Sequence, residues 1–124
     1  MGLKLYGNPL SNNTKRVAMV LKEKNIPYEF VAVDIDKREY KTSSFLEKHP
    51  FGQVPYIDDD GFILFESRAI ARYIALKYKD QGTSLVPDPS DLRAVALFEQ
   101  AASIERSNFD VYAYGLHSEK FLKP

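Results

Sequence analysis

A proline at an interior position of a predicted β-strand is the feature that most restricts the fold of this chain. The strand-like run Gln53-Val54-Pro55-Tyr56-Ile57 follows Gly52, and its proline has no N–H to donate to a neighbouring strand. Pro55 therefore lies either in an edge strand or at a turn with a cis bond to Val54, a form that X-Pro bonds adopt far more readily than others. A cis bond would turn the N–H and C=O of Val54 outward, where an extended ligand can pair with them. The residues of this segment alone leave both possibilities open.

The first third of the chain predicts a strand, a helix and a second strand. Residues 3–6 alternate as a strand does and end at a Gly-Asn-Pro turn. Apolar residues then recur at helical spacing, and a second strand follows over residues 28–33, with Phe30, Val31 and Val33 expected in the core. This order over so short a distance predicts a right-handed βαβ unit.

The next segment adds a short helix, a hairpin and another helix. The charged residues 34–42 predict a surface loop, and the capping-box pattern Ser44–Glu47 predicts a short helix ending at His49-Pro50. Three aspartates and a glycine at 58–61 predict a hairpin turn, with a return strand over 62–65 and a helix from Glu66-Ser67. The fold class is therefore α/β, in the order βαβ-α-ββα.

The remaining residues predict a linker and one long helix. Residues 81–89 contain a glycine, two prolines and an aspartate, whereas residues from Leu92 to about Glu119 carry apolar side chains at helical frequency. We expect a first domain over residues 1–80, the linker over 81–89, and the first helix region of an incomplete all-α domain over 90–124.

Composition excludes several classes of function. Seventeen basic residues balance seventeen acidic ones in the 124-residue chain, which gives no reason to expect a nucleic-acid or anionic-membrane partner. The absence of cysteine and the presence of only two histidines argue against a thiolate nucleophile or a metal site. No apolar run is long enough for a membrane span and no secretory pattern opens the chain, so we expect a soluble, cytoplasmic protein.

Two predicted helix starts are candidate sites. Ser11 opens the first helix, where it is either an N-cap or a hydroxyl donor to a bound anion such as a thiolate; spacing alone favours the cap, because no base lies nearby in sequence. Glu66-Ser67-Arg68 is either a second capping segment, with Ser67 holding backbone amides and Arg68 on the surface, or a site for a zwitterion. In the second case Ser67 and adjacent amides take a carboxylate and Glu66 an ammonium group. Lys41 either binds a further carboxylate or is a solvated lysine.

Three segments together resemble the phi class of glutathione transferases: "LYGNPLSNNTKRV", "YKTSSFLEKHPFGQVP" and "LFESRAIARYIALKY". The resemblance covers residues 1 to about 80 strongly and continues more weakly into "SNFDVYAYGLHSEKFLKP". It implies a thioredoxin-like domain followed by an all-helical domain, a homodimer, and a role in detoxification. It also implies that glutathione is the co-substrate, without metal or nucleotide, for conjugation to hydrophobic electrophiles or reduction of organic peroxides.

The resemblance also assigns roles to individual residues. Ser11 is expected to stabilise the glutathione thiolate and act in catalysis, and Phe51 to contact the partner subunit. The expected glutathione-binding residues are Tyr40, Lys41, Gln53, Val54, Pro55 (with a cis bond), Glu66 and Ser67.

Two kinds of departure from the family accompany these assignments. The family usually has histidine at the position of Tyr40 and asparagine at the position of His49. Its members also run to about 200 residues or more, so we expect an incomplete chain whose glutathione site is intact and whose second-substrate site is not. A non-catalytic binding or interaction module of the same fold is the alternative function.

Overall fold

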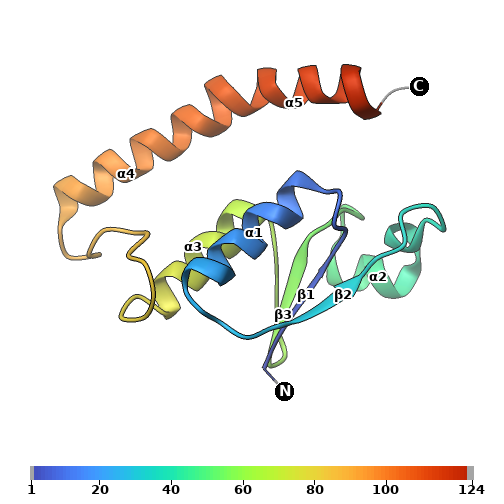
Figure 1. Ribbon diagram of the computed structural model, residues 1–124, viewed down its shortest axis with the longest axis horizontal. Helices are drawn as coiled ribbons and strands as arrows, with labels where there is room; N and C mark the ends of the chain where they lie inside the picture. The colour runs from blue at the N-terminus through green and yellow to red at the C-terminus, as the bar shows by residue number, and fades with distance from the viewer. Residues whose placement is uncertain (1, 123–124) are drawn as a thin grey trace. The chain divides into compact units, whose positions relative to one another are not determined.

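The computed structural model of the chain describes residues 2–122. The chain divides into two compact units, Met1–Leu85 and Val86–Pro124, each of which is described by itself (Figure 1). The division falls within the predicted linker. Met1, Lys123 and Pro124, which belong to the predicted domains, lie outside the described residues.

The first unit is built on a four-stranded mixed sheet. Its strands are β1 (Leu3–Gly7), β2 (Glu29–Ala32), β3 (Tyr56–Asp59) and β4 (Phe62–Phe65), arranged in the order β2-β1-β3-β4. β1 is parallel to β2 and antiparallel to β3, which is antiparallel to β4. This is the predicted α/β, thioredoxin-like order of elements.

Helices α1 (Asn12–Glu23) and α3 (Ser67–Lys77) lie side by side on one face of the sheet (Figure 1). Their apolar residues recur every three or four positions, so one stripe of each helix is buried. The core between the helices and the sheet consists of Leu3, Leu5, Val17, Leu21, Ile26, Ile57, Ile70 and Ile74.

A smaller apolar cluster covers the opposite face of the sheet. Phe45 of α2 (Ser43–Lys48) packs with Val33 and Tyr56, and its ring meets that of Tyr56 edge-on at 5.3 Å between centroids. The expectation that Phe30 contributes to the core is wrong, because its side chain is 39% exposed on the edge strand β2.

The start of α2 differs from the predicted capping box. Thr42, rather than Ser44, is the N-cap, and its hydroxyl accepts a hydrogen bond from the Phe45 N–H at 3.3 Å. Both residues are good caps, but the predicted surface loop before them already contains a 3₁₀ turn, η1 (Glu39–Lys41). That turn ends at Thr42 and fixes where the helix begins.

Pro55 lies directly before a strand and not within one. β3 begins at Tyr56 and has a hydrogen-bonded neighbour on each side, so the edge-strand alternative is wrong. The Val54–Pro55 peptide bond is cis, as expected from the family resemblance. The hairpin that follows turns at Asp60 and Gly61, whose φ angles of 54° and 98° place both in the left-handed region that tight hairpins require.

The second unit is a single helical run. It begins with α4 (Leu92–Ile104), capped by Asp91, and continues through the π-helical segment η2 (Glu105–Asp110), α5 (Val111–His117) and the π-helical η3 (Ser118–Leu122). The predicted long helix is thus present, with its hydrogen-bond pattern alternating between α and π. Over residues 2–122, no helix is both long enough and apolar enough to cross a membrane.

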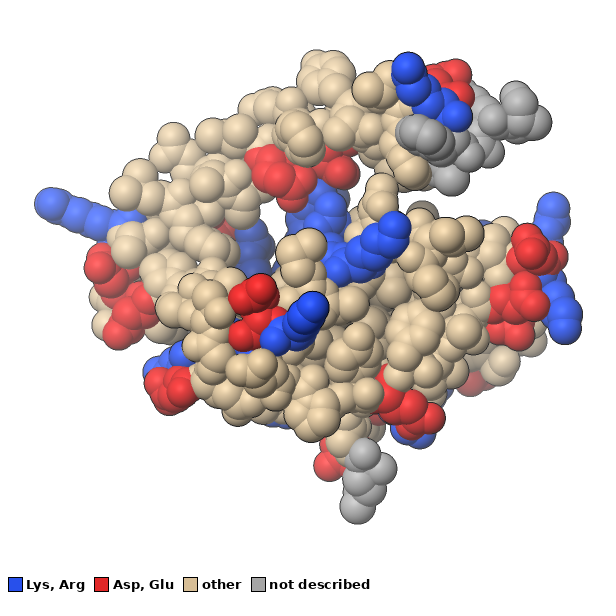
Figure 2. Space-filling model, viewed as in Figure 1, with Lys and Arg blue, Asp and Glu red and all other residues tan. Residues whose placement is uncertain are grey.

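Charged side chains of both signs are interspersed over the surface. On the face in Figure 2, Lys and Arg alternate with Asp and Glu without an extended patch of one sign. This distribution accords with the equal numbers of basic and acidic residues.

A charged cluster links the sheet to α3. The buried Asp59 accepts hydrogen bonds from Tyr73 Oη at 2.5 Å and from Lys77 Nζ at 2.6 Å. Burial alone would raise the pKa of the Asp59 carboxyl, but the hydrogen bonds from Lys77 and Tyr73 outweigh it and hold this pKa below its usual value. The cluster therefore favours the charged carboxylate in the folded chain.

We expect Asp59→Asn to lower the free energy of unfolding by about 1–2 kcal/mol at pH 7, because charge-assisted hydrogen bonds exceed neutral ones by about that much. Since the folded-state pKa is depressed, the contribution is present above pH 3.8 and is lost as the pH falls through the folded-state value. Denaturant unfolding followed by circular dichroism measures both effects. Asp60→Asn, at the exposed hairpin turn, is the control, and an equal loss in both variants would contradict the prediction.

Candidate functional site

The first site segment is the turn that joins β1 to α1. Ser11 is the N-cap of α1, and its Oγ accepts a hydrogen bond from the Thr14 N–H at 3.1 Å. The N-cap role that the sequence spacing favoured for Ser11 is thus confirmed. A hydroxyl that accepts one bond still has its own proton to donate, so the cap geometry fixes Oγ and leaves the O–H available for a bound anion.

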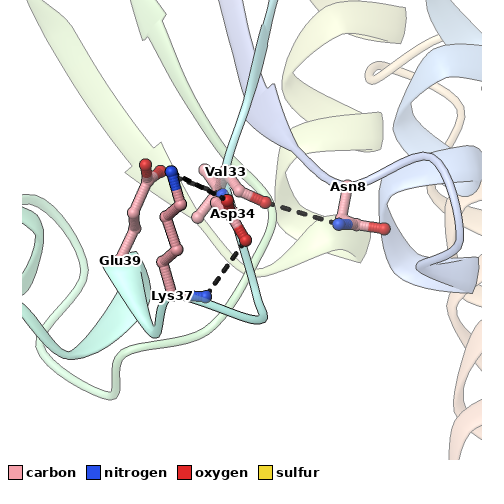
Figure 3. Close-up of polar contacts among 5 residues, drawn as sticks. All are labelled: Asn8, Val33, Asp34, Lys37 and Glu39. Atoms are coloured by element: carbon pink, nitrogen blue, oxygen red, sulfur yellow. Dashed lines mark hydrogen bonds and ion pairs between the residues drawn. The ribbon is translucent and has the colours of Figure 1, made fainter.

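Asn8 holds this turn against the end of β2. Its side-chain Nδ2 donates to the Val33 carbonyl at 3.3 Å, and its Oδ1 accepts from the Leu10 N–H at 2.9 Å. Figure 3 shows the Asn8 side chain pointing at Val33, where the following loop is itself closed by bonds between Asp34 and residues Lys37 and Glu39. One amide therefore connects the Ser11 turn to the loop that leads to Tyr40 and Lys41.

The second segment is the junction between β4 and α3. Glu66 is the N-cap residue of α3, but its side chain makes no capping bond, and its φ of 76° is unusual for a residue with a side chain. The buried Ser67 hydroxyl accepts a bond from Arg16 Nη1 at 2.8 Å, and the same Arg16 atom lies 2.6 Å from Asn13 Oδ1. Arg16 thus ties the start of α3 to the first turn of α1.

These segments border one polar pocket. It is lined by Asn13, His49, Gln53, Val54, Pro55, Glu66, Ser67 and Arg68. Five of the eight predicted site residues are therefore brought together. Ser11, Tyr40 and Lys41 are not among the lining residues; Ser11 lies two positions before Asn13, on the turn that leads into α1.

Tyr40 and Lys41 reach the pocket region through Gly52. Gly52 has a φ of 60°, and a Cβ built on it would lie 2.7 Å from the Tyr40 carbonyl oxygen and 3.2 Å from Lys41 Nζ. Only a residue without a side chain permits this approach. It places the predicted carboxylate-binding lysine beside the segment that carries Gln53 and Val54.

His49 is a lining residue to which the sequence assigned no role. Its side chain is 2% exposed and its Nδ1 has no hydrogen-bond partner. Burial lowers the pKa of the imidazole, and the nearby Glu66 carboxylate opposes this in part. Asn13 and Arg16 were also missed, although both lie within the quoted motif around Ser11 and share the first turns of its helix. Arg68, expected at the surface, lines the pocket.

The pocket can hold a ligand that carries both charges. An exposed carboxylate at Glu66 suits an ammonium group, whereas Arg68 and the uncapped N-terminus of α3 suit a carboxylate. Over residues 2–122, no group of three His, Asp or Glu side chains is placed to hold a metal ion. The geometry therefore favours recognition of an amino-acid-like zwitterion.

Comparison with known proteins identifies a family for this region. The sequence profile of the glutathione S-transferase N-terminal domain matches residues 1–76. Among curated relatives, glutathione S-transferase hmp2 of Hypomyces subiculosus is 49% identical over 99% of this chain and 57% of its own length. Glutathione S-transferase PM239X14 of Arabidopsis thaliana is 48% identical over 95% of this chain and 55% of its own.

Solved structures lead to the same family. Glutathione transferase F7 of Populus trichocarpa superposes with a TM-score of 0.91 at 38% identity, over 97% of this chain and 56% of that one. The maize glutathione S-transferase I, solved with an atrazine glutathione conjugate, gives 0.88 at 30% identity over 100% and 56%. The chain thus spans about half the length of the relatives it matches.

The close approach of the Tyr40 carbonyl oxygen to Gly52 predicts that a methyl group at residue 52 lowers the stability of the fold. We expect Gly52→Ala to lower the free energy of unfolding by about 2–4 kcal/mol, because it adds left-handed strain of about 1 kcal/mol to a steric displacement of about 1–3 kcal/mol. Denaturant unfolding is the measurement. Asn25→Ala, at an exposed residue with a φ of 56°, is the control for strain alone. Equal losses of unfolding free energy in the two variants would show that the methyl group at residue 52 does not clash with the Tyr40 carbonyl.

Proposed function

This chain belongs to the glutathione S-transferase family, with relatives in its F, or phi, class, and from that premise we propose that it binds glutathione and activates the thiol for transfer to an electrophile. The observation that carries the proposal is the polar pocket of Gln53, Val54, Pro55, Glu66 and Ser67. All five residues lie inside the matched region, 1–76.

The γ-glutamyl end of glutathione occupies the start of α3 in this proposal. Its ammonium group pairs with Glu66, and its carboxylate accepts hydrogen bonds from Ser67 and from N–H groups in the first turn of the helix. The hydroxyl of Ser67 accepts from Arg16 and keeps its own proton for the ligand. The neighbouring guanidinium adds positive charge beside the carboxylate.

The rest of the tripeptide follows the segment before β3. Val54 is half-buried and lines the pocket, so its backbone can pair with the cysteinyl unit in the manner of an added strand. Gln53 contacts the ligand beyond it. Lys41, with Tyr40 beside it, binds the glycyl carboxylate, since Lys41 lies against Gly52.

Ser11 supplies the catalytic hydrogen bond. A thiol has a pKa of about 8.5, and the thiolate is the nucleophile. A hydroxyl donor at a helix N-terminus stabilises the thiolate, and each unit of pKa lowering corresponds to about 1.4 kcal/mol of that preference. With an aryl halide, the thiol proton leaves to solvent, the sulfur–carbon bond forms, and the halide departs with the bonding pair.

The second substrate is a hydrophobic electrophile, and an organic peroxide is a second candidate class. Because the chain spans about half the length of its relatives, a glutathione-binding module without turnover is the competing function. Calorimetric titration with glutathione and a conjugation assay with an aryl halide separate the two. Binding without conjugation supports the module, and absence of binding contradicts the proposed site.

We expect Ser11→Ala to lower the conjugation rate about 10- to 100-fold, the equivalent of one charge-assisted hydrogen bond of about 1.5–3 kcal/mol. Glutathione binding should be largely retained, because Ser11 contacts only the sulfur. Ser11→Thr, which keeps both the cap and the hydroxyl, is the control for the loss of an N-cap. An unchanged rate in Ser11→Ala would remove Ser11 from the mechanism.

A homodimer with Phe51 at its interface completes the proposal. Phe51 is 65% exposed although it is a large apolar side chain. Aromatic side chains of this kind often anchor protein interfaces. Light scattering is expected to give the mass of a dimer for the native chain and of a monomer for Phe51→Ser. Met19→Ser, at a residue of α1 that is 62% exposed, should leave the mass unchanged. A native monomer would contradict the assignment.

A further inference from the structure

His49 stands where the family resemblance indicates asparagine, and it is built into the wall of the pocket. It follows α2 directly, and its N–H donates to the Phe45 carbonyl at 2.9 Å while its own carbonyl accepts from the Gly52 N–H at 2.9 Å. The backbone of His49 therefore fixes the turn that carries Gly52 toward Gln53 and Val54.

The imidazole lies within an aromatic group. It stacks on Phe65 with 4.5 Å between ring centroids and an interplanar angle of 29°. Phe45 lies parallel to it at 6.4 Å and Phe51 meets it edge-on at 6.3 Å. The three rings shield the imidazole from water, and burying a charged imidazolium there would cost free energy. The contacts therefore favour the uncharged ring.

One acidic residue acts on the ring. Glu66 follows Phe65 directly in the chain, lines the same pocket, and acts electrostatically on His49. The ring nitrogen Nδ1 is buried without a hydrogen-bond partner. His49 is thus more than nine-tenths buried, lacks a hydrogen-bond partner at Nδ1, and lines the same pocket as Glu66. Packing alone explains this combination poorly.

We propose that His49 is a positioning residue of the glutathione site, whose neutral imidazole keeps the Glu66 carboxylate available for the ammonium group of the ligand. The inference rests on the proposed function. A protonated His49 would share Glu66 with the ligand's ammonium group and repel that group, so the two cations exclude each other. Binding and protonation are then linked, and each weakens the other by the same factor.

The other charges near His49 bear on whether its protonation opposes ligand binding. Arg68 of α3 lines the same pocket, Lys48 precedes His49 on α2, and Lys41 lies against Gly52. Glu66 is thus the acidic group that acts on the ring, and Glu47, which precedes Lys48 on α2, is a further acidic group near His49 in sequence. Tyr56, which packs on Phe45, stays neutral because burial raises its pKa to about 12.

The sign of the pH dependence follows from the burial of the ring. The folded-state pKa of His49 lies below the ordinary value of 6.5 because burial disfavours the charge. The neutral ring therefore contributes fully above pH 6.5, and its contribution is lost as the pH falls through the folded-state value. Glutathione, by adding a second cation beside Glu66, should lower the pKa of His49 further.

The experiment follows the two histidines of the chain, His49 and His117, by NMR titration of their imidazole C–H resonances between pH 4.5 and 8. Spectra are recorded with and without saturating glutathione, and His117→Asn assigns the signals. We expect the midpoint of His49 to lie below 6.5 and to fall by about 0.5–1 unit with glutathione, which corresponds to about three- to tenfold in affinity.

Calorimetry gives the reciprocal measurement. The ratio of glutathione dissociation constants between the native chain and His49→Asn should rise about three- to tenfold as the pH falls from 7 to 5; the ratio cancels the titration of glutathione itself. His117→Asn should behave as the native chain. If glutathione binds at pH 7 but the His49 midpoint is unchanged by it, or if His49 does not titrate above pH 4.5, only this inference is overturned. If glutathione does not bind at pH 7, the proposed function and the inference both fail.

Discussion

The pairing of Tyr6 with Tyr56 and of Tyr56 with Phe65 is the constraint on which the site depends. These pairs set the register of β1 on β3 and of β3 on β4, and the first is reinforced by rings stacked 4.4 Å apart. Because the strands end together, the Ser11 turn, the Gln53–Pro55 segment and the Glu66 junction emerge at the same edge of the sheet. A slip of one residue in either register would turn the side chains of that strand to the opposite face and separate the three segments.

Much of this frame follows from the sequence because its signals are local. Helical spacing at Val17 and Leu21, and the Asp-Gly turn before Phe62, specify elements whose interactions lie within a few residues. Errors arose where neighbours distant in sequence decide the outcome. Phe30 is apolar and in a strand, yet β2 is an edge strand and leaves the ring 39% exposed.

The pocket was harder to predict than the frame for the same reason. Ser67 and Arg16 are separated by 51 positions and meet at 2.8 Å, and no periodicity in either helix indicates this contact. His49 is buried by rings from α2, β4 and the loop at Phe51, so its environment exists only in the folded chain. Motif resemblance named five of the residues that line the pocket, whereas contacts such as that between Arg16 and Ser67 became visible only in three dimensions.

The helices of the first unit, and the helix that opens the second, differ in how they are capped. α1, α2 and α4 begin with side-chain caps from Ser11, Thr42 and Asp91, which satisfy N–H groups that would otherwise lack partners.

At α3 the pattern differs within the described residues. Glu66 occupies the N-cap with a φ of 76° and makes no side-chain bond, and the hydroxyl of Ser67 is engaged by Arg16. Glutamate is not a preferred cap, and left-handed backbone at such a residue is retained mainly where surrounding structure enforces it. The first turn of α3 thus lacks a side-chain cap, and in the proposed function the carboxylate of the ligand completes this turn while Glu66 pairs with the ammonium group of the same ligand.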